Sequence, residues 1–417
     1  MRAPLLLRTT VLLLTAVLAQ PSEAATETLR YSFTGGADGG QPSGGVVADS
    51  AGALYGVAAT GGPAQLGVVY RLTPPTSGRQ WTETVLHAFQ GLDRGDGDEP
   101  QTGLVIDKAG ALYGTTFFGG TANNGTVFKM TPLAGGSGLW REAVLFSFCP
   151  NLGNCSDGQQ PVGLTAGHNG EFYAVLRFGG PLHGGTVVRL TPPASGIGPW
   201  TETVLVGLPF GSQPRASVLL DAGGALYGTT AFAGEHNRGS VFKVTPPAKG
   251  KTNWTLTILW SFGGTPTDGR VPLAAVTRGP DGALYGTTAT GGGKANAGVV
   301  FRLAPPGPGR QSWQETVVHS FNGADGANPL AGVIFDSRGA LYSNIAAGGP
   351  TGGGSVVKLA RAADGVTWLA QVLHSFRTKT DAAEPIDSLL IRSTGELIGT
   401  ADEGGQFGQG AVYRILP

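Results

Sequence analysis

The segment 103–148 decides the fold, because it contains four short apolar runs separated by turn residues. The first two runs, 103–106 (GLVI) and 111–116 (ALYGTT), are joined by Asp107-Lys108-Ala109-Gly110, in which Asp opens and Gly closes a β-turn. The third run is 125–130 (GTVFKM) and the fourth is 140–148 (WREAVLFSF). Runs of this length and composition, bounded by Gly, Pro and Asp, predict four antiparallel strands.

This unit is repeated along the chain. The Leu112-Tyr113-Gly114 motif has counterparts centred on residues 55, 173, 227, 285, 342 and 398, with spacings between 54 and 60 residues. Seven units of four strands predict a β-propeller. An open β-solenoid is the alternative, but the two chain ends are complementary. The run 28–33 (TLRYSF) is of the fourth type and the run 410–416 is of the third type. The sequence therefore predicts an all-β, seven-bladed β-propeller, with the N-terminal strand completing the last blade.

The composition agrees with a repeat protein and excludes some functions. The 417 residues include 71 Gly and 28 Pro, which without a period would suggest disorder, but 41% of the residues are hydrophobic. The glycines fall mainly at fixed turn positions of the repeat. Lys and Arg number 28, and so do Asp and Glu. A chain with no net positive charge is not expected to bind nucleic acid.

Residues 1–24 have the pattern of a secretory signal peptide. Arg2 and Arg8 precede an apolar stretch at 11–19, and Ser22-Glu23-Ala24 places small residues at the cleavage positions. An uncleaved N-terminal anchor is the alternative, although the apolar stretch is short for a membrane span. We expect cleavage after Ala24, a single propeller domain over 25–417 without a membrane span, and a secreted or periplasmic location. No anchor segment follows Pro417, which favours free secretion over surface anchoring.

Both cysteines of the chain lie in one loop, at Cys149 and Cys155. An exported protein is in an oxidising compartment, so a local disulfide is the simplest expectation. Two thiols without a neighbouring His do not make a metal site, and five intervening residues do not fit a redox-active CxxC pair.

The repeat resembles a known family. Units of the form P-x-x-G-L-x-x-D-x-x-G-x-L-Y-G-T-T-x-x-G-G, followed by G-x-V-F-K-x-T-P and W-T-E-T-V-L-x-S-F, look like the Gloeobacter/Verrucomicrobia (GloVer) tandem repeat. The resemblance covers almost the whole chain after residue 24. It implies an exported bacterial repeat protein, and it attaches no defined activity to the repeat.

An Asp-Gly-x-x-Pro sequence recurs between the fourth run of one unit and the first run of the next. In a propeller these loops share one face, so their carboxylates could form a ring that binds a cation or sugar hydroxyls. The alternative is that each Asp caps its own turn while Gly supplies a positive φ and Pro starts the next strand. Together with Asp98 from the richest loop, the candidate binding residues are Asp38, Asp96, Asp98, Asp157, Asp268, Asp325 and Asp381.

The loop 93–99 carries four carboxylates, at Asp93, Asp96, Asp98 and Glu99, and is a candidate Ca²⁺ loop. Its spacing does not match an EF-hand, so no cofactor is assigned. Three histidines, at positions 87, 319 and 374, occupy a repeat position that is Tyr, Phe, Val or Trp elsewhere, which indicates packing. We assign no metal ligands and no catalytic residues.

The leading hypothesis for function is a non-enzymatic, monomeric, exported binding module for carbohydrate or another cell-envelope polymer. A propeller enzyme, a lyase or a glycoside-active protein, is one alternative. It would use Asp98 or Glu99 with His183 or His236. A structural envelope protein without a specific ligand is the other.

Overall fold

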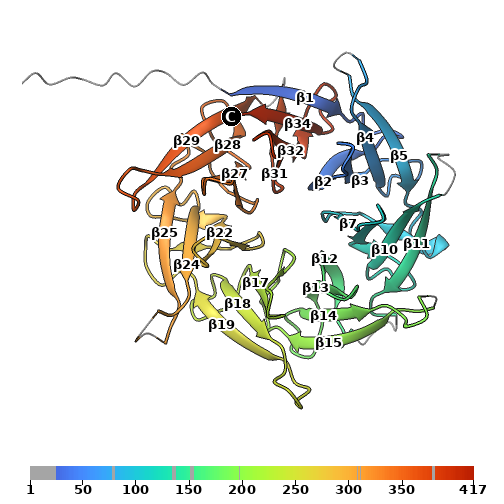
Figure 1. Cartoon of the computed structure of the whole chain (residues 1–417), viewed down its shortest axis with the longest axis horizontal. Coiled ribbons are helices and arrows are strands. Elements are labelled where there is room, and N and C mark those ends of the chain that lie inside the picture. The colour runs from blue at the N-terminus through green and yellow to red at the C-terminus, as the bar shows by residue number, and fades with distance from the viewer. Residues whose placement is uncertain are drawn as a thin grey trace, which may run out of the picture.

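The computed structural model describes residues 25–77, 80–133, 138–150, 155–196, 198–307, 309, 311–377 and 381–417. The predicted signal peptide, 1–24, lies outside the described residues. Seven four-stranded antiparallel sheets are arranged in a ring within the described part of the chain (Figure 1). The predicted seven-bladed β-propeller is confirmed.

Each blade runs from an inner strand to an outer strand. From the inner strand outward, blades one to three consist of β2 (Gly40–Ala48), β3 (Leu54–Thr60), β4 (Val68–Thr73) and β5 (Thr82–Ala88); β7 (Val105–Ile106), β8 (Leu112–Thr116), β10 (Thr126–Pro132) and β11 (Trp140–Ser147); and β12 (Gln159–Ala166), β13 (Phe172–Phe178), β14 (Thr186–Thr191) and β15 (Thr201–Gly207).

Blades four to six follow the same order. They consist of β16 (Leu219–Leu220), β17 (Leu226–Thr230), β18 (Ser240–Thr245) and β19 (Thr255–Ser261); β21 (Thr277–Arg278), β22 (Leu284–Thr288), β24 (Val299–Ala304) and β25 (Gln314–Ser320); and β26 (Ile334–Phe335), β27 (Leu341–Ile345), β28 (Gly352–Arg361) and β29 (Trp368–Arg377). Three short pairs decorate the loops: β6 (Gly97–Asp98) with β9 (Phe118–Gly119), β20 (Gly269–Arg270) with β23 (Thr290–Gly291), and β30 (Ala382–Ala383) with β33 (Glu403–Gly404). One 3₁₀ turn, η1, spans Leu92–Arg94.

Blade seven joins the two ends of the described chain. Its strands are β31 (Leu390–Ile391), β32 (Leu397–Ala401), β34 (Ala411–Leu416) and, outermost, β1 (Thr26–Ser32). Thr26 is opposite Leu416 and Ser32 is opposite Ala411, so β1 pairs along its length with β34 (Figure 1). The expected closure by the N-terminal strand is confirmed. With β1 in place, β34 has a hydrogen-bonded strand on both sides, and the last blade has four strands like the other six.

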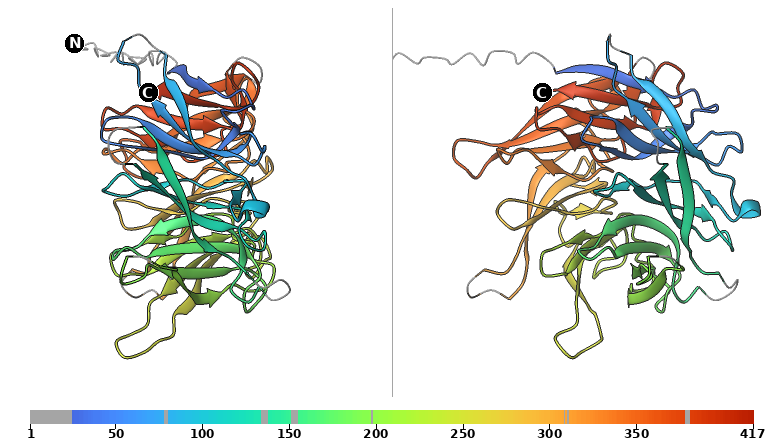
Figure 2. Two further views of the ribbon diagram at one scale, coloured as in Figure 1. Left: turned by 90° about the vertical axis from the view of Figure 1, so that its right-hand side faces the viewer. Right: turned by 45° about the vertical axis from the view of Figure 1, so that its right-hand side comes forward.

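Seen from the side, the ring is a disc, and the connections between strands gather on its two flat faces (Figure 2). Because the strands are antiparallel, the loops that leave the outer strands share one face with the loops between the second and third strands. We call this the upper face. The opposite, lower face carries the D-x-x-G turns. No helix among the described residues is long and apolar enough to cross a membrane.

The Leu-Tyr-Gly motif is explained by packing across the second and third strands. Gly228 lies directly opposite Phe242 on β18, and a Cβ on Gly228 would sit 2.5 Å from Phe242 Cζ. Five blades share this arrangement, with an aromatic ring opposite each glycine. Where the motif has Ala174 in place of Gly, the residue opposite is Val188. A small backbone position and a large ring therefore fill one space together.

The outer strand of every blade contains a register shift at the same position. In blade one, Val69 is opposite His87 and Tyr70 is opposite Val85, so Leu86 is the extra residue. A bulge of this kind bends and twists the strand and changes the direction of the side chains that follow. As a result, the residue at the His87 position points to the Asp-Gly turn beyond the strand.

Candidate binding groove between blades four and five

A groove of about 690 Å³ runs along the outer seam between β19 of blade four and β25 of blade five. Its lining includes two tryptophans, Trp260 and Trp313, together with His236, Asp268 and Glu315. Among the larger cavities of the described chain, this one combines two tryptophans and a histidine with three carboxyl groups, since Glu235 also lines it.

The two tryptophans are held by the blade core beneath them. Trp260 and Trp313 both pack against the apolar cluster between the two blades, and both keep part of their surface exposed. Trp313 also stands edge-on to Tyr227, with ring centroids 6.3 Å apart. The rings are therefore fixed on one side and free on the other, as an aromatic platform for a ligand requires.

Three buried polar atoms of the groove have no hydrogen-bond partner among the described residues: Trp260 Nε1, Asp268 Oδ1 and Glu315 Oε1. Asp268 is only 4% exposed, and its other oxygen, Oδ2, accepts hydrogen bonds from the backbone N–H groups of Gly263 (2.7 Å) and Gly264 (3.1 Å). Buried polar atoms are costly unless they are satisfied. One donor and two carboxyl oxygens beside this groove therefore lack a hydrogen-bond partner among the described residues.

Burial changes the acidity of both carboxyl groups. Burial and, to a smaller extent, the nearby Asp268 raise the pKa of Glu315 to about 7. Burial also raises the pKa of Asp268, against the lowering effect of its backbone hydrogen bonds. Near neutral pH, Glu315 is thus partly protonated and can donate as well as accept a hydrogen bond.

The aspartates of the recurring Asp-Gly turns lie at the ends of the outer strands, where each accepts a backbone N–H of its own turn. Asp96, for example, accepts from Gln90 N (2.9 Å) and Gly97 N (2.6 Å). The lining of the central cavity, about 450 Å³, includes Arg215 and Asp387 but none of the seven candidate aspartates. The same turn contacts are made by Asp38, Asp157, Asp268, Asp325 and Asp381.

Asp98 differs from the other candidates, since it lies on the short strand β6 opposite Phe118. Burial raises the pKa of Asp98 and of Glu99, and the Glu99 carboxylate accepts a hydrogen bond from Gln101. Neither belongs to a group of metal-ligating side chains within the described residues. His236 lines the groove described above, which includes neither Asp98 nor Glu99, and His183 lies in an exposed loop of blade three.

A second set of carboxyl groups was not singled out from the sequence. The Glu of the W-T-E-T-V run faces the Asp-Gly turn of the preceding blade, and its pKa is raised mainly by burial. The pKa is about 7 for Glu83, Glu142 and Glu315 and about 8 for Glu202. In each case the Asp of that turn acts in the same direction. The signal in the sequence is paired replacement: where the turn has Phe210 in place of Asp, the strand has Leu256 in place of Glu.

The histidine position is more than a packing position. His87 and His319 each stand edge-on to a phenylalanine, as expected, but their Nε2 atoms also contact Asp96 (2.9 Å) and Asp325 (2.7 Å). Tyr31, at the same repeat position, donates to Asp38 (2.9 Å).

The disulfide expected between the two cysteines, Cys149 and Cys155, is present, with a Cα–Cα distance of 5.0 Å.

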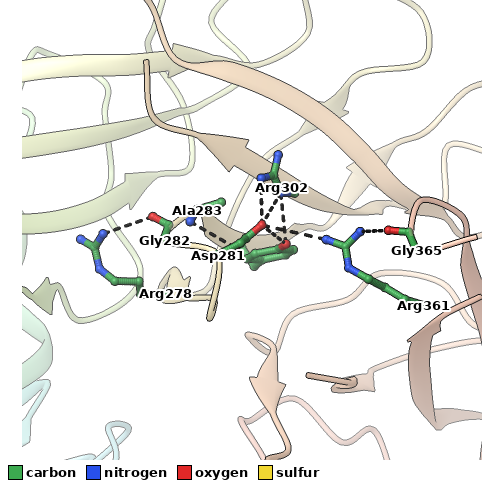
Figure 3. Close-up of polar contacts among 8 residues, drawn as sticks. Arg278, Asp281, Gly282, Ala283, Arg302, Arg361 and Gly365 are labelled. Atoms are coloured by element: carbon green, nitrogen blue, oxygen red, sulfur yellow. Dashed lines mark hydrogen bonds and ion pairs between the residues drawn. The ribbon is translucent and has the colours of Figure 1, made fainter. Parts of the chain in front are cut away.

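The lower face has its own polar clusters around the turns that precede the Leu-Tyr motifs. In blade five this turn has Gly279 where the D-x-x-G turns of blades one, two, four and six have Asp, and its carboxylate is Asp281, two positions later. Asp281 accepts from Tyr285 Oη (3.0 Å) and from Arg302 Nε (2.8 Å), and Arg361 approaches it to 4.0 Å (Figure 3). Arg302 and the other partners hold the pKa of Asp281 below its usual range, although burial acts in the opposite direction. These groups satisfy one another, so we place the binding site elsewhere.

The family model of the Gloeobacter/Verrucomicrobia repeat matches residues 16–148 and 138–313. The chain belongs to this family. The matched residues span the first four blades and all but the outer strand of the fifth, and they include both tryptophans of the groove. No curated protein matches the chain.

Solved structures share the fold of this Gloeobacter/Verrucomicrobia repeat protein at low identity. One is a candidate 6-phosphogluconolactonase from Bacteroides uniformis, with 13% identity, a TM-score of 0.50 and coverage of 87% of this chain and 89% of that one. Another is the extracellular domain of a candidate hybrid two-component system from B. thetaiotaomicron. It has 14% identity, a TM-score of 0.54 and coverage of 94% of this chain and 42% of that one. These likenesses establish the propeller fold alone.

Proposed function

We propose that this repeat protein is an exported carbohydrate-binding module, with its binding site in the groove between blades four and five. The observation that carries the proposal is the pairing of two anchored tryptophans with unsatisfied polar atoms in one groove. Sugars present apolar faces that stack on aromatic rings, and hydroxyl groups that need hydrogen-bond partners on the same protein surface.

The groove suits a neutral or weakly basic glycan better than an acidic one. Asp268 and Glu315 both line it, and a negative charge on the ligand would be repelled there. A volume of about 690 Å³ lies within the range of sites that enclose small ligands, and a groove along a seam can accept part of a longer chain.

A panel of soluble neutral polysaccharides and oligosaccharides tests the proposal, followed by calorimetric titration of the best ligand. Trp313→Ala should weaken binding about tenfold or more, because truncating a central aromatic anchor removes most of its contact area. Trp140→Ala is the matched control, since Trp140 has the same repeat position between blades one and two, where it contacts Tyr55. Equal affinities of the two variants, or no binding of any glycan, would contradict the proposal.

Glycoside hydrolysis at the same groove is the second candidate, favoured by the raised pKa of Glu315 beside Asp268. A group that is protonated near neutral pH can act as a general acid. Incubating the bound oligosaccharide with the protein and with Glu315→Gln separates the two functions. Cleavage lost in the variant indicates an enzyme, and an intact oligosaccharide with retained binding indicates a binding module.

A further inference from the structure

Two groups of His, Asp and Glu side chains among the described residues have ligand atoms that all lie within 4.8 Å of one another. One consists of Glu27, His374 and Asp381, and the other of His87, Asp96 and Glu142. Both occupy the same repeat positions: the Glu on one outer strand, and the His and Asp at the end of the outer strand of the preceding blade.

The first group lies where the ring closes. Glu27 belongs to β1, the N-terminal strand that completes blade seven, whereas His374 is on β29 of blade six and Asp381 follows it. Its side chains are largely buried, with 9% exposure for Glu27, 18% for His374 and 16% for Asp381. Ligands from two blades and from both ends of the chain thus meet at one point.

The distances from the histidine nitrogen to the two carboxylates in this group are longer than those of ordinary hydrogen bonds. His374 Nε2 is 3.4 Å from Glu27 Oε2 and 3.5 Å from Asp381 Oδ2, and this buried nitrogen has no hydrogen-bond partner among the described residues. Ligands at about 2.0–2.1 Å from a tetrahedral zinc ion are about 3.3–3.4 Å apart. The imidazole nitrogen therefore has nearly the separation from each carboxylate that two corners of a zinc tetrahedron have.

The second group is arranged differently. His87 Nε2 is 2.9 Å from Asp96 Oδ2, which also accepts from Gln90 N, so this pair is closed by hydrogen bonds. A third pair, His319 and Asp325, has the same contact at 2.7 Å, but Ala370 occupies the repeat position of the Glu. Within the described chain, the seam between blades six and seven is therefore the place where a Glu, a His and an Asp lie together and the histidine nitrogen is 3.4–3.5 Å from both carboxylates.

We propose that Glu27, His374 and Asp381 bind one Zn²⁺ ion, which ties the N-terminal strand to blade six. One imidazole and two carboxylates form a donor set that zinc accepts, and the ion would compensate the negative charge of the two carboxylates. The site would strengthen ring closure, because Glu27 and His374 are 347 positions apart.

The test is calorimetric titration of metal-free full-length protein with ZnCl₂, with zinc content measured after dialysis. We expect one zinc per chain in the unaltered protein and almost none in His374→Phe. His319→Phe makes the same substitution at a seam without the Glu and should keep the zinc. Phe is compatible with this position, since Phe146 occupies it in blade two. Zinc should also raise the unfolding temperature of the unaltered protein and of His319→Phe, but not of His374→Phe.

A second variant covers the case in which His374→Phe does not fold. Glu27→Leu copies the residue found at this position in blade four, Leu256, and should also lose the zinc. Three results would overturn the proposal. The unaltered protein could show no saturable zinc binding, or the His374→Phe and His319→Phe variants could hold equal amounts of zinc. The third is that His87→Phe loses the zinc while His374→Phe keeps it. These results are independent of glycan binding, which is measured at another seam.

Discussion

Replacing Gly228 by Ala tests the packing rule that places a ring against each Leu-Tyr-Gly motif. A Cβ at this position would lie 2.5 Å from Phe242 Cζ and 2.9 Å from Phe242 Cε1, whereas ordinary contacts begin near 3.4 Å. The ring must therefore move by roughly 1 Å, yet Phe242 is fully buried in the core between blades three and four. Overpacking of this kind costs about 1–3 kcal/mol, and we expect Gly228→Ala to lower the free energy of unfolding by about 2 kcal/mol.

A double-mutant cycle shows whether the ring is the cause. Blade three already contains the compensated pair, Ala174 opposite Val188. In a Phe242→Val background, Gly228→Ala should therefore cost less than about 0.5 kcal/mol, so the two substitutions should be coupled by more than about 1 kcal/mol. Chemical denaturation followed by tryptophan fluorescence measures all four proteins.

The control is Gly307→Ala, at an exposed position with no described atom within 4 Å of the added Cβ and no positive φ. It should leave the free energy of unfolding unchanged within error. An equal cost of Gly228→Ala with and without Phe242→Val would refute the reasoning, because the cost would then not come from the ring.

Two further predictions concern stability. The pKa of Glu202 is raised to about 8 by burial and by Asp157, so folding favours its protonated form. The contribution of this carboxyl group to the free energy of unfolding is complete below the ordinary pKa of a glutamate, about 4.5, and is lost as the pH rises through about 8. The unfolding temperature should therefore fall between about pH 5 and pH 8, and less steeply in Glu202→Gln; identical slopes would contradict this. Replacing Cys149 and Cys155 by Ser should lower the free energy of unfolding by about 2 kcal/mol, as expected for a short closed loop. The same loss should follow reduction of the unaltered protein, and thermal unfolding with and without reductant measures it.

The repeat made the fold predictable from sequence. Turn residues at a fixed spacing located the strands, and the unmatched runs at the two ends predicted how β1 closes blade seven. The disulfide could also be predicted, since Cys149 and Cys155 are close in one loop and have no other cysteine to pair with.

The candidate site was much less predictable, for a physical reason. The bulge in each outer strand adds one residue, such as Leu86, so side-chain directions beyond it cannot be read from simple alternation. It also turns the following residue, such as His87, toward the Asp of the next turn. The groove depends further on which strands are neighbours across a seam: Trp260 and Trp313 are 53 positions apart and lie on or beside the outer strands of different blades.

Paired replacements are the signal that could have revealed these contacts. Phe210 and Leu256 replace Asp and Glu together, and Ala174 and Val188 replace Gly and an aromatic ring together. Comparing repeats within one chain thus gives information about contacts between blades as well as within them.

The most direct test of the proposed function is a crystal structure of the protein with the oligosaccharide that binds best. The groove between blades four and five predicts a sugar ring stacked on Trp313 or Trp260, with a hydroxyl within hydrogen-bond distance of Asp268 Oδ1. A sugar bound in the central cavity beside Arg215, or on the lower face, with the groove empty, would contradict the account.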